Sequence, residues 1–368
     1  MAKFIHTADW QIGRRFTRHG EDVSALLYDE RFEVVKRIAK LAAESGIGLV
    51  VVAGDVFEHR PPDNRDLRRL FGILGESDPT WLLLPGNHDH GGAGGPWDRA
   101  RDLELVPGNV RLLDAPGPVI LEDEGLAVLP APLRTRQPQY DLTEEAFNYD
   151  TGASLIRVGL AHGSVTGVLP DGADSANPIA AERAERANLD YLALGDWHGS
   201  LRVNDRTWYS GTPETDRFRN NRSGQVLAVD IPEPGAIPAV TEVPTGRFRW
   251  HDLDSPLHVD SDVDRVRQDL DAYGFDDLVK ISFSGALSLR AREALLHLRE
   301  EVEAKVRYLD WEAGGVETKI EPDDLDSLSL SPLARAILEE LESRRTEVAQ
   351  AVFTEAVVAL VALDRELS

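Results

Sequence analysis

Short apolar runs that stop abruptly at polar residues dominate the first 200 residues, and they constrain the fold more than any other feature. Runs at 4–8, 48–53, 81–84, 155–161 and 191–194 are each followed within two residues by glycine, Asp or His. Segments 29–45 and 66–74 carry apolar residues at helical spacing, and 126–129 adds another strand. Alternating strands and helices predict a layered α/β domain, whose parallel strands end at one edge of a sheet.

The pattern changes further along the chain. Strands are expected at 225–231 and 239–243. A smaller α+β unit then follows, with strands at 279–283 and 308–311 around a helix at 291–306. After an acidic stretch, Ser331 and Pro332 form a helix-start signal, and the chain is expected to be helical from there to 367. We therefore predict domains at 1–245 and 246–320, with a linker and helical segment at 321–368.

Composition removes several classes of protein. The chain has no cysteine, which excludes disulfide scaffolds, thiol catalysis and iron–sulfur clusters. A net charge of −24 argues against a basic protein that coats DNA. No apolar run is long enough to span a membrane and no secretory leader is visible, so we expect a cytoplasmic protein.

The residues at the strand ends are of the types that bind divalent cations. They are Asp9, Gln11, Asp55, Asn87, His88, Asp89, His162, Asp196 and His198. Oxygen and nitrogen ligands without sulfur suit Mn²⁺, Fe²⁺, Zn²⁺ or Mg²⁺. Two such ions about 3.5–4 Å apart can activate a water molecule and clamp a phosphate. Asp55 is the natural bridging ligand, because it follows the strongest strand. His6 lies inside a strand and is expected to be a core histidine.

In order, the segments Asp-x-Gln, Gly-Asp, Gly-Asn-His-Asp, His-Gly and Gly-x-x-His resemble the motifs of the calcineurin-like metallophosphoesterases. The opening HTADWQIG, the GDVF segment and the small domain after 246 are similar to SbcD-type (YhaO-like) DNA repair exonucleases. The resemblance implies a β-sandwich flanked by helices, with a small α+β cap domain and C-terminal helices.

The resemblance also implies roles for individual residues. One ion would be bound by Asp9, Gln11, Asp55 and His198. A second ion would be bound by Asp55, Asn87, His162 and Asp196. His88 would assist the leaving oxygen, with Asp89 orienting it. Substrate phosphates would contact Arg14, Arg15, His59, Arg60, Arg217 and Arg219. For the basic residues at 65–69, a solvated helix face is an equal alternative.

The function implied is a Mn²⁺-dependent DNA nuclease, with Mg²⁺ or Fe²⁺ as other candidate ions, in double-strand-break repair. The resemblance implies a coiled-coil ATPase partner of the SbcC or YhaN type. This chain has no P-loop motif, so it is not itself the ATPase. A homodimer is a further candidate assembly. The apolar helix expected around 348–363 either packs on its own domain or docks on a partner or a second copy of the chain.

Two departures from the family pattern keep other functions open. Gln11 and Asp196 stand where the family has histidine, which weakens one ligand and adds a negative charge to the other. Asp196 is alternatively a residue that orients a ligand, and Gln11 a residue that touches only a metal-bound water. The two rival hypotheses are a small-molecule phosphodiesterase or phosphatase, and a scaffold subunit without catalysis.

Overall fold

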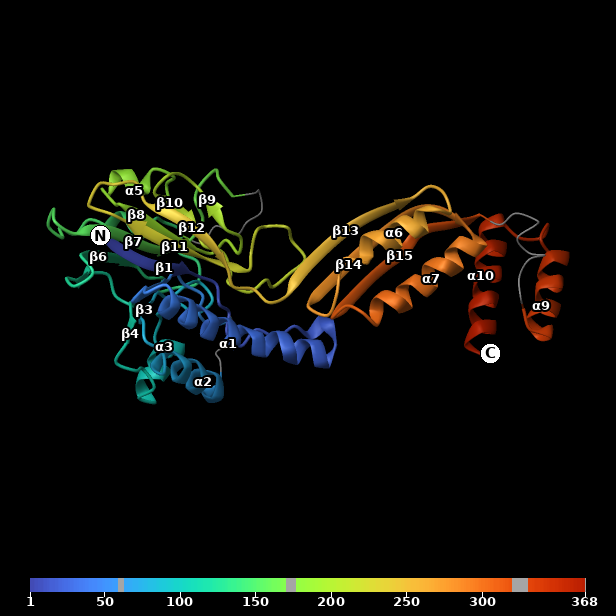
Figure 1. Ribbon diagram of the computed structural model, residues 1–368, viewed down its shortest axis with the longest axis horizontal. Helices are drawn as coiled ribbons and strands as arrows, with labels where there is room; N and C mark the ends of the chain where they lie inside the picture. The colour runs from blue at the N-terminus through green and yellow to red at the C-terminus, as the bar shows by residue number, and fades with distance from the viewer. Residues whose placement is uncertain (59–62, 170–176, 320–329, 368) are drawn as a thin grey trace. The chain divides into compact units, whose positions relative to one another are not determined.

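The computed structural model describes residues 1–58, 63–169, 177–319 and 330–367 (Figure 1). Within these residues the chain divides into two compact units, Met1–Arg249 and Trp250–Ser368. The first unit contains all the strand-end residues singled out above. The three-part division expected from the sequence stays a prediction.

The first unit contains two six-stranded sheets. One has the order β12-β11-β1-β2-β3-β4, in which β1 (Ala2–Thr7), β2 (Leu49–Val52), β3 (Thr80–Leu83) and β4 (Val110–Leu112) are parallel. Antiparallel to β1 runs β11 (Gln225–Ile231), followed at the edge by β12 (Ala239–Pro244). Every residue of β2 is buried, as its unbroken Leu-Val-Val-Val sequence predicts.

The second sheet has the order β5-β6-β7-β8-β10-β9. Its parallel strands are β6 (Leu126–Ala131), β7 (Ile156–His162), β8 (Tyr191–Gly195) and β10 (Thr207–Tyr209). The edges are formed by β5 (Val119–Leu121) and β9 (Leu201–Arg202). Phe4 and Val51 of the first sheet share a buried apolar cluster with Leu160 and Tyr191 of the second. The two sheets therefore face one another across a common core, as in a β-sandwich.

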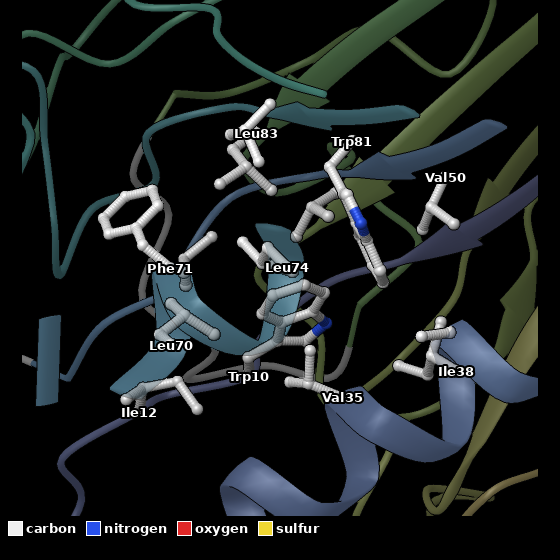
Figure 2. Packing of buried hydrophobic residues seen from close by; sticks show 14 of the residues in the cluster. Trp10, Ile12, Val35, Ile38, Val50, Leu70, Phe71, Leu74, Trp81 and Leu83 are labelled. Carbon is white, nitrogen blue, oxygen red and sulfur yellow. The ribbon is translucent and has the colours of Figure 1, made fainter. Parts of the chain in front are cut away.

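Helices cover the outer faces of both sheets. On the first sheet lie α1 (Glu21–Glu44), α2 (Asn64–Gly75) and α3 (Pro96–Asp102), and Figure 2 shows Val35 and Leu74 packing around Trp10 and Trp81. Short helices α4 (Thr143–Ala146) and α5 (Arg183–Arg186) pack on the second sheet. A one-turn 3₁₀ helix, η1 (Thr17–His19), precedes α1. This arrangement confirms the predicted layered α/β fold class.

The second unit has a three-stranded sheet of β13 (Arg249–Leu257), β14 (Asp277–Ser288) and β15 (Tyr308–Lys319). Its helices α6 (Asp262–Leu270) and α7 (Leu289–Glu303) supply the other half of the core (Figure 1). Both β14 and β15 extend well beyond the predicted strands. The prediction stopped where apolar residues give way to Ser, Gly and Glu, but backbone pairing continues there past an irregularity between Ser282 and Ser284.

The C-terminal segment is helical as expected, and the chain turns after Ser343 to divide it into two helices. The structure has α9 (Pro332–Ser343) and α10 (Gln350–Glu366). The Ser331 hydroxyl caps α9 by accepting from the Ala334 amide, as predicted. The turn lets Phe353 and Val357 of α10 meet Leu338 of α9. Phe353, Val357 and Leu360 of the apolar stretch thus pack back on their own unit, whereas Val352 and Leu363 remain exposed. No helix in the described part of the chain is both long and apolar enough to cross a membrane.

Candidate metal centre

Residues from both sheets of the first unit meet at the carboxyl ends of their parallel strands. Asp9 follows β1, Asp55 follows β2, and Asn87 follows β3. His162 ends β7, and Asp196 follows β8. The His162 Nε2 atom lies 3.5 Å from Asp55 Oδ1, so strands of the two sheets converge on one place.

The loops that carry these residues adopt an unusual backbone conformation. Four residues that are not glycine have positive φ there: Asp9 at 55°, Gln11 at 48°, Asp55 at 52° and Asp196 at 99°. Such backbone is disfavoured for side chains with a Cβ and tends to occur at functional sites. Backbone bonds from Asp9 N to Gly54 O (3.1 Å) and from Gln11 N to Asp55 O (2.9 Å) join the first two loops.

Three side-chain oxygen atoms lie within 4 Å of His162 Nε2. The His162 Nδ1–H donates to the Ala53 carbonyl at 2.8 Å, because a carbonyl can only accept. The Nε2 atom then faces Asn87 Oδ1 at 3.1 Å, Asp55 Oδ1 at 3.5 Å and Asp196 Oδ1 at 3.8 Å. We call Asp55, Asn87, His162 and Asp196 the cation cluster.

The cation cluster and its neighbour Asp9 fit a divalent cation. Ligand atoms of Asp9, Asp55 and His162 all lie within 4.8 Å of one another. Asp9 is fully buried, and its Oδ2 atom has no hydrogen-bond partner among the described residues. A buried carboxylate oxygen without a donor is costly unless a cation neutralises it.

Electrostatics at the cluster favour positive charge. Burial alone would lower the pKa of His162, but the charges of Asp55, Asp9 and Asp196 raise it to about 9. Burial raises the pKa of Asp9, and it also raises the pKa of Asp196, although nearby histidines act in the opposite direction. Without a metal ion, a proton on His162 offsets part of the negative charge.

Glycine is required at two positions beside these ligands. A Cβ on Gly86 would lie 2.1 Å from Asp55 Oδ1. A Cβ on Gly54 would lie 2.3 Å from His162 Nδ1, and Gly54 has a φ of 91°. Any side chain at either position would displace a candidate ligand.

His88 lies beside the cluster and is held by the carboxylate of Glu58, which follows the GDVF segment. Its Nδ1 atom lies 3.0 Å from Glu58 Oε1, and its backbone N–H donates to Asp55 Oδ1 at 2.9 Å. Asp89, expected to orient His88, instead accepts from the amides of Gly86 (2.6 Å) and Phe57 (3.0 Å). Burial and the negative charge of Asp55 raise the pKa of Asp89 to about 7. The geometry therefore gives the orienting role to Glu58, and Asp89 braces the two loops.

Gln11 and His198 belong to a closed hydrogen-bonded ring that we call the Arg14 ring. Arg14 donates from one nitrogen to Gln11 Oε1 and to Asp216 Oδ2, the latter at 2.6 Å. The Gln11 amide nitrogen lies 3.3 Å from His198 Nε2, and His198 Nδ1 lies 2.9 Å from Asp216 Oδ2. Asp216 was missed by the sequence reasoning, because it follows no strand and belongs to no motif. Despite burial, His198 and Arg14 hold its pKa well below the usual value.

Comparison with known proteins agrees with this geometry. The sequence profile described as calcineurin-like phosphoesterase matches residues 2–200, which is more than half of the chain. The chain belongs to the calcineurin-like phosphoesterase family. The family and the candidate metal-binding group together indicate a metal-dependent phosphoester hydrolase that uses divalent ions.

Solved structures also resemble this phosphoesterase. The protein TT1561 of Thermus thermophilus has a TM-score of 0.41 and 13% identity, and the match covers 66% of this chain and 99% of that one. A second crystal structure has a TM-score of 0.43 and 14% identity, covering 66% and 98% of the two chains. No match was found among curated protein sequences.

The basic residues expected to bind substrate lie in different surroundings in this phosphoesterase. Arg14 and Arg217 both pair with the buried Asp216. Arg219 lies over the Trp197 ring, 5.6 Å from its centroid. Arg15 is exposed, next to a cavity of about 650 Å³. His59 and Arg60 lie outside the described residues.

The contacts of His6 and Arg69 bear on two further expectations: a core role for His6, and a solvated helix face at 65–69. His6 is a satisfied core histidine as expected, with Tyr191 Oη 3.0 Å from Nδ1 and the Leu194 carbonyl 3.2 Å from Nε2. Burial lowers its pKa to about 3, so it stays neutral. Arg69 lies 4.0 Å from the centroid of the Phe32 ring and pairs with Asp29, which favours the helix-face alternative for that arginine.

Proposed function

We propose that this phosphoesterase is a divalent-metal-dependent DNA nuclease that hydrolyses phosphodiester bonds. The observation that carries the proposal is the convergence of the cation cluster, with His88 directly beside it. A bound ion at this position would activate water and polarise a phosphate. The predominance of oxygen ligands favours Mn²⁺ or Mg²⁺.

The residues around the cluster have separate parts in this chemistry. Glu58 accepts from His88 Nδ1 and keeps the imidazole oriented, with Nε2 3.9 Å from Asp55 Oδ2. The carboxylates of Glu58 and Asp55 raise the pKa of His88 against the opposing effect of burial. A protonated His88 can then give its Nε2 proton to the leaving oxygen of the ester.

DNA is proposed as the substrate on two grounds. The segments HTADWQIG and GDVF are similar to those of SbcD-type exonucleases. The exposed residues Arg15 and Arg219 follow or adjoin metal-site loops, where guanidinium groups can pair with backbone phosphates. In a chain of net charge −24, such local positive charge would determine where a polyanion binds.

The proposed activity is tested with linear double-stranded DNA and Mn²⁺. His88→Ala should lower the cleavage rate by about 10²–10⁴-fold, because the leaving oxygen loses its proton donor. His297→Ala, at an exposed position on α7, is the matched control and should retain activity. Unchanged cleavage by His88→Ala would refute the assignment. Hydrolysis of nucleotide esters with no DNA cleavage would instead support the small-molecule alternative, and absence of bound metal the scaffold alternative.

We also propose that α9 and α10 dock on a coiled-coil ATPase of the SbcC or YhaN type. Large apolar side chains on these helices remain exposed, including Leu333 at 69% and Val352 at 55%. Exposed apolar helix residues favour a partner helix. The double variant Leu333→Glu/Val352→Glu should abolish co-elution with the purified ATPase. Co-elution that is unaffected would refute this surface, and concentration-dependent self-association lost in the variant would indicate a homodimer instead.

A further inference from the structure

We propose that the metal centre is asymmetric: the cation cluster holds one ion tightly, and the Arg14 ring closes the neighbouring position. In this arrangement the Arg14 guanidinium supplies positive charge at the position where a second ion would lie. A second ion therefore binds much more weakly than the first. The inference rests on the proposed function, and it concerns how many ions the same centre holds before substrate arrives.

The Arg14 ring satisfies its own polar groups. Arg14 donates to the oxygen of the Gln11 amide, so the nitrogen of that amide is directed at His198 Nε2, 3.3 Å away. His198 Nδ1 lies 2.9 Å from Asp216 Oδ2 and 2.8 Å from Arg217 Nη2; in the tautomer with the proton on Nδ1, Asp216 accepts that proton and the Nε2 lone pair takes the Gln11 proton. The two atoms that would bind a first ion, Gln11 Oε1 and His198 Nε2, are therefore both hydrogen-bonded.

The cation cluster presents the opposite situation. His162 Nε2 and the oxygens of Asp55, Asn87 and Asp196 are all acceptors when the imidazole is neutral, and the oxygens lie 3.1–3.8 Å from Nε2. Separations of this size are those of adjacent ligands around one ion of ordinary coordination distance. An ion in the cation cluster relieves the repulsion between these lone pairs. An ion at Gln11 and His198 must instead break the hydrogen bonds of the Arg14 ring.

Glutamine is the residue that makes the ring possible. Its amide has a donor and an acceptor, so it can bridge the Arg14 guanidinium and the His198 lone pair. A histidine at position 11 cannot accept from Arg14 and bind an ion through the same nitrogen.

Arg14 is also suited to contact the substrate. Its side chain is 23% exposed, whereas Asp216 beneath it is 1% exposed. Arg14 is thus held by its ion pair with the buried Asp216, and part of its side chain reaches solvent. A guanidinium in that place can pair with a phosphate oxygen of an arriving substrate.

The test is a titration of the metal-free protein with Mn²⁺, followed by calorimetry and by low-temperature electron paramagnetic resonance. The wild-type chain should bind one ion tightly and give the spectrum of an isolated Mn²⁺. Any second ion should bind at least about tenfold more weakly. The double variant Gln11→His/Arg14→Met should bind two ions and give the spectrum of a spin-coupled pair.

Controls separate this inference from the proposed function. Arg18→Met, at an exposed position on η1, should bind Mn²⁺ as the wild type does. Gln11→His alone, which keeps the Arg14–Asp216 pair, should already strengthen the second binding event. Two equally tight ions with a coupled spectrum in the wild type would overturn the asymmetry while DNA cleavage stands. Failure of the wild type to bind Mn²⁺ would refute the proposed function and this inference together.

Discussion

Asp216→Asn should destabilise the first unit by about 3–5 kcal/mol at pH 7, the typical effect of breaking a buried ion pair. The Asp216 carboxylate accepts from Arg14 (2.6 Å), His198 (2.9 Å) and Arg217 (2.9 Å). Charge-assisted bonds contribute about 1.5–3 kcal/mol each, but Arg14 and Arg217 are 23% and 41% exposed, so solvent screens part of that effect. Asparagine keeps the shape and removes the charge.

The pH dependence gives this prediction a second measurement. Because the pKa of Asp216 is held well below its usual value, its ionised form stabilises the fold. That contribution is complete above the unfolded pKa of about 4 and is lost as the pH falls through the folded pKa. The difference in unfolding free energy between wild type and Asp216→Asn should therefore be constant from about pH 5 to 8 and shrink below about pH 4.

Urea unfolding followed by tryptophan fluorescence measures these free energies. Asp230→Asn is the matched control, because Asp230 is 41% exposed and pairs with Lys3 at 3.2 Å on the surface. It should cost less than about 1 kcal/mol. If Asp216→Asn costs no more than this control, Asp216 does not hold the Arg14 ring together.

Three further predictions concern the cation cluster. Gly86→Ala should lower Mn²⁺ affinity by about 10–100-fold, because its Cβ would displace Asp55; calorimetry showing unchanged affinity would contradict this. Since the pKa of His162 is about 9 without metal, Mn²⁺ binding at pH 7 should release about one proton, and affinity should rise about tenfold per pH unit up to about pH 9. Calorimetry in buffers of different ionisation enthalpy counts that proton, and no release would refute the assignment. Glu58→Gln should lower the pKa of His88 and move the alkaline limb of the cleavage profile to lower pH, whereas an unmoved limb would show that Glu58 does not act through His88.

The sequence predicts the sheets well, because burial on both faces leaves a continuous apolar run. The strand at 225–231 has the predicted bounds, and β2 lies within the predicted 48–53. Strand-end positions follow from this, so Asp9, Asp55 and His162 could be expected to lie near one another. The helix starting at 21 was predicted to start at 29, because its first turns are too polar to show an apolar face.

Contacts between side chains on different loops could not be predicted in the same way. The choice between Glu58 and Asp89 as partner of His88 depends on which carboxylate the backbone amides of Gly86 and Phe57 already occupy. Asp216 lies far along the chain from the early motifs and follows no strand. The part that Asp216 plays becomes visible only in the structure, where its carboxylate contacts both Arg14 and His198.

Charge balance connects the Arg14 ring to the substrate. Asp9 and the two carboxylates of the cation cluster, together with Asp216, carry four negative charges when ionised. Arg14, Arg217 and one divalent ion carry four positive charges, so the centre is neutral with a single ion. A second ion in the absence of substrate would leave two uncompensated positive charges in a buried site, which is costly. Phosphate groups of a bound strand supply negative charge at that place and can also draw Arg14 away from Gln11. On this reasoning a second ion binds with substrate rather than before it, and non-hydrolysable DNA should raise the number of Mn²⁺ ions bound per chain from one to two.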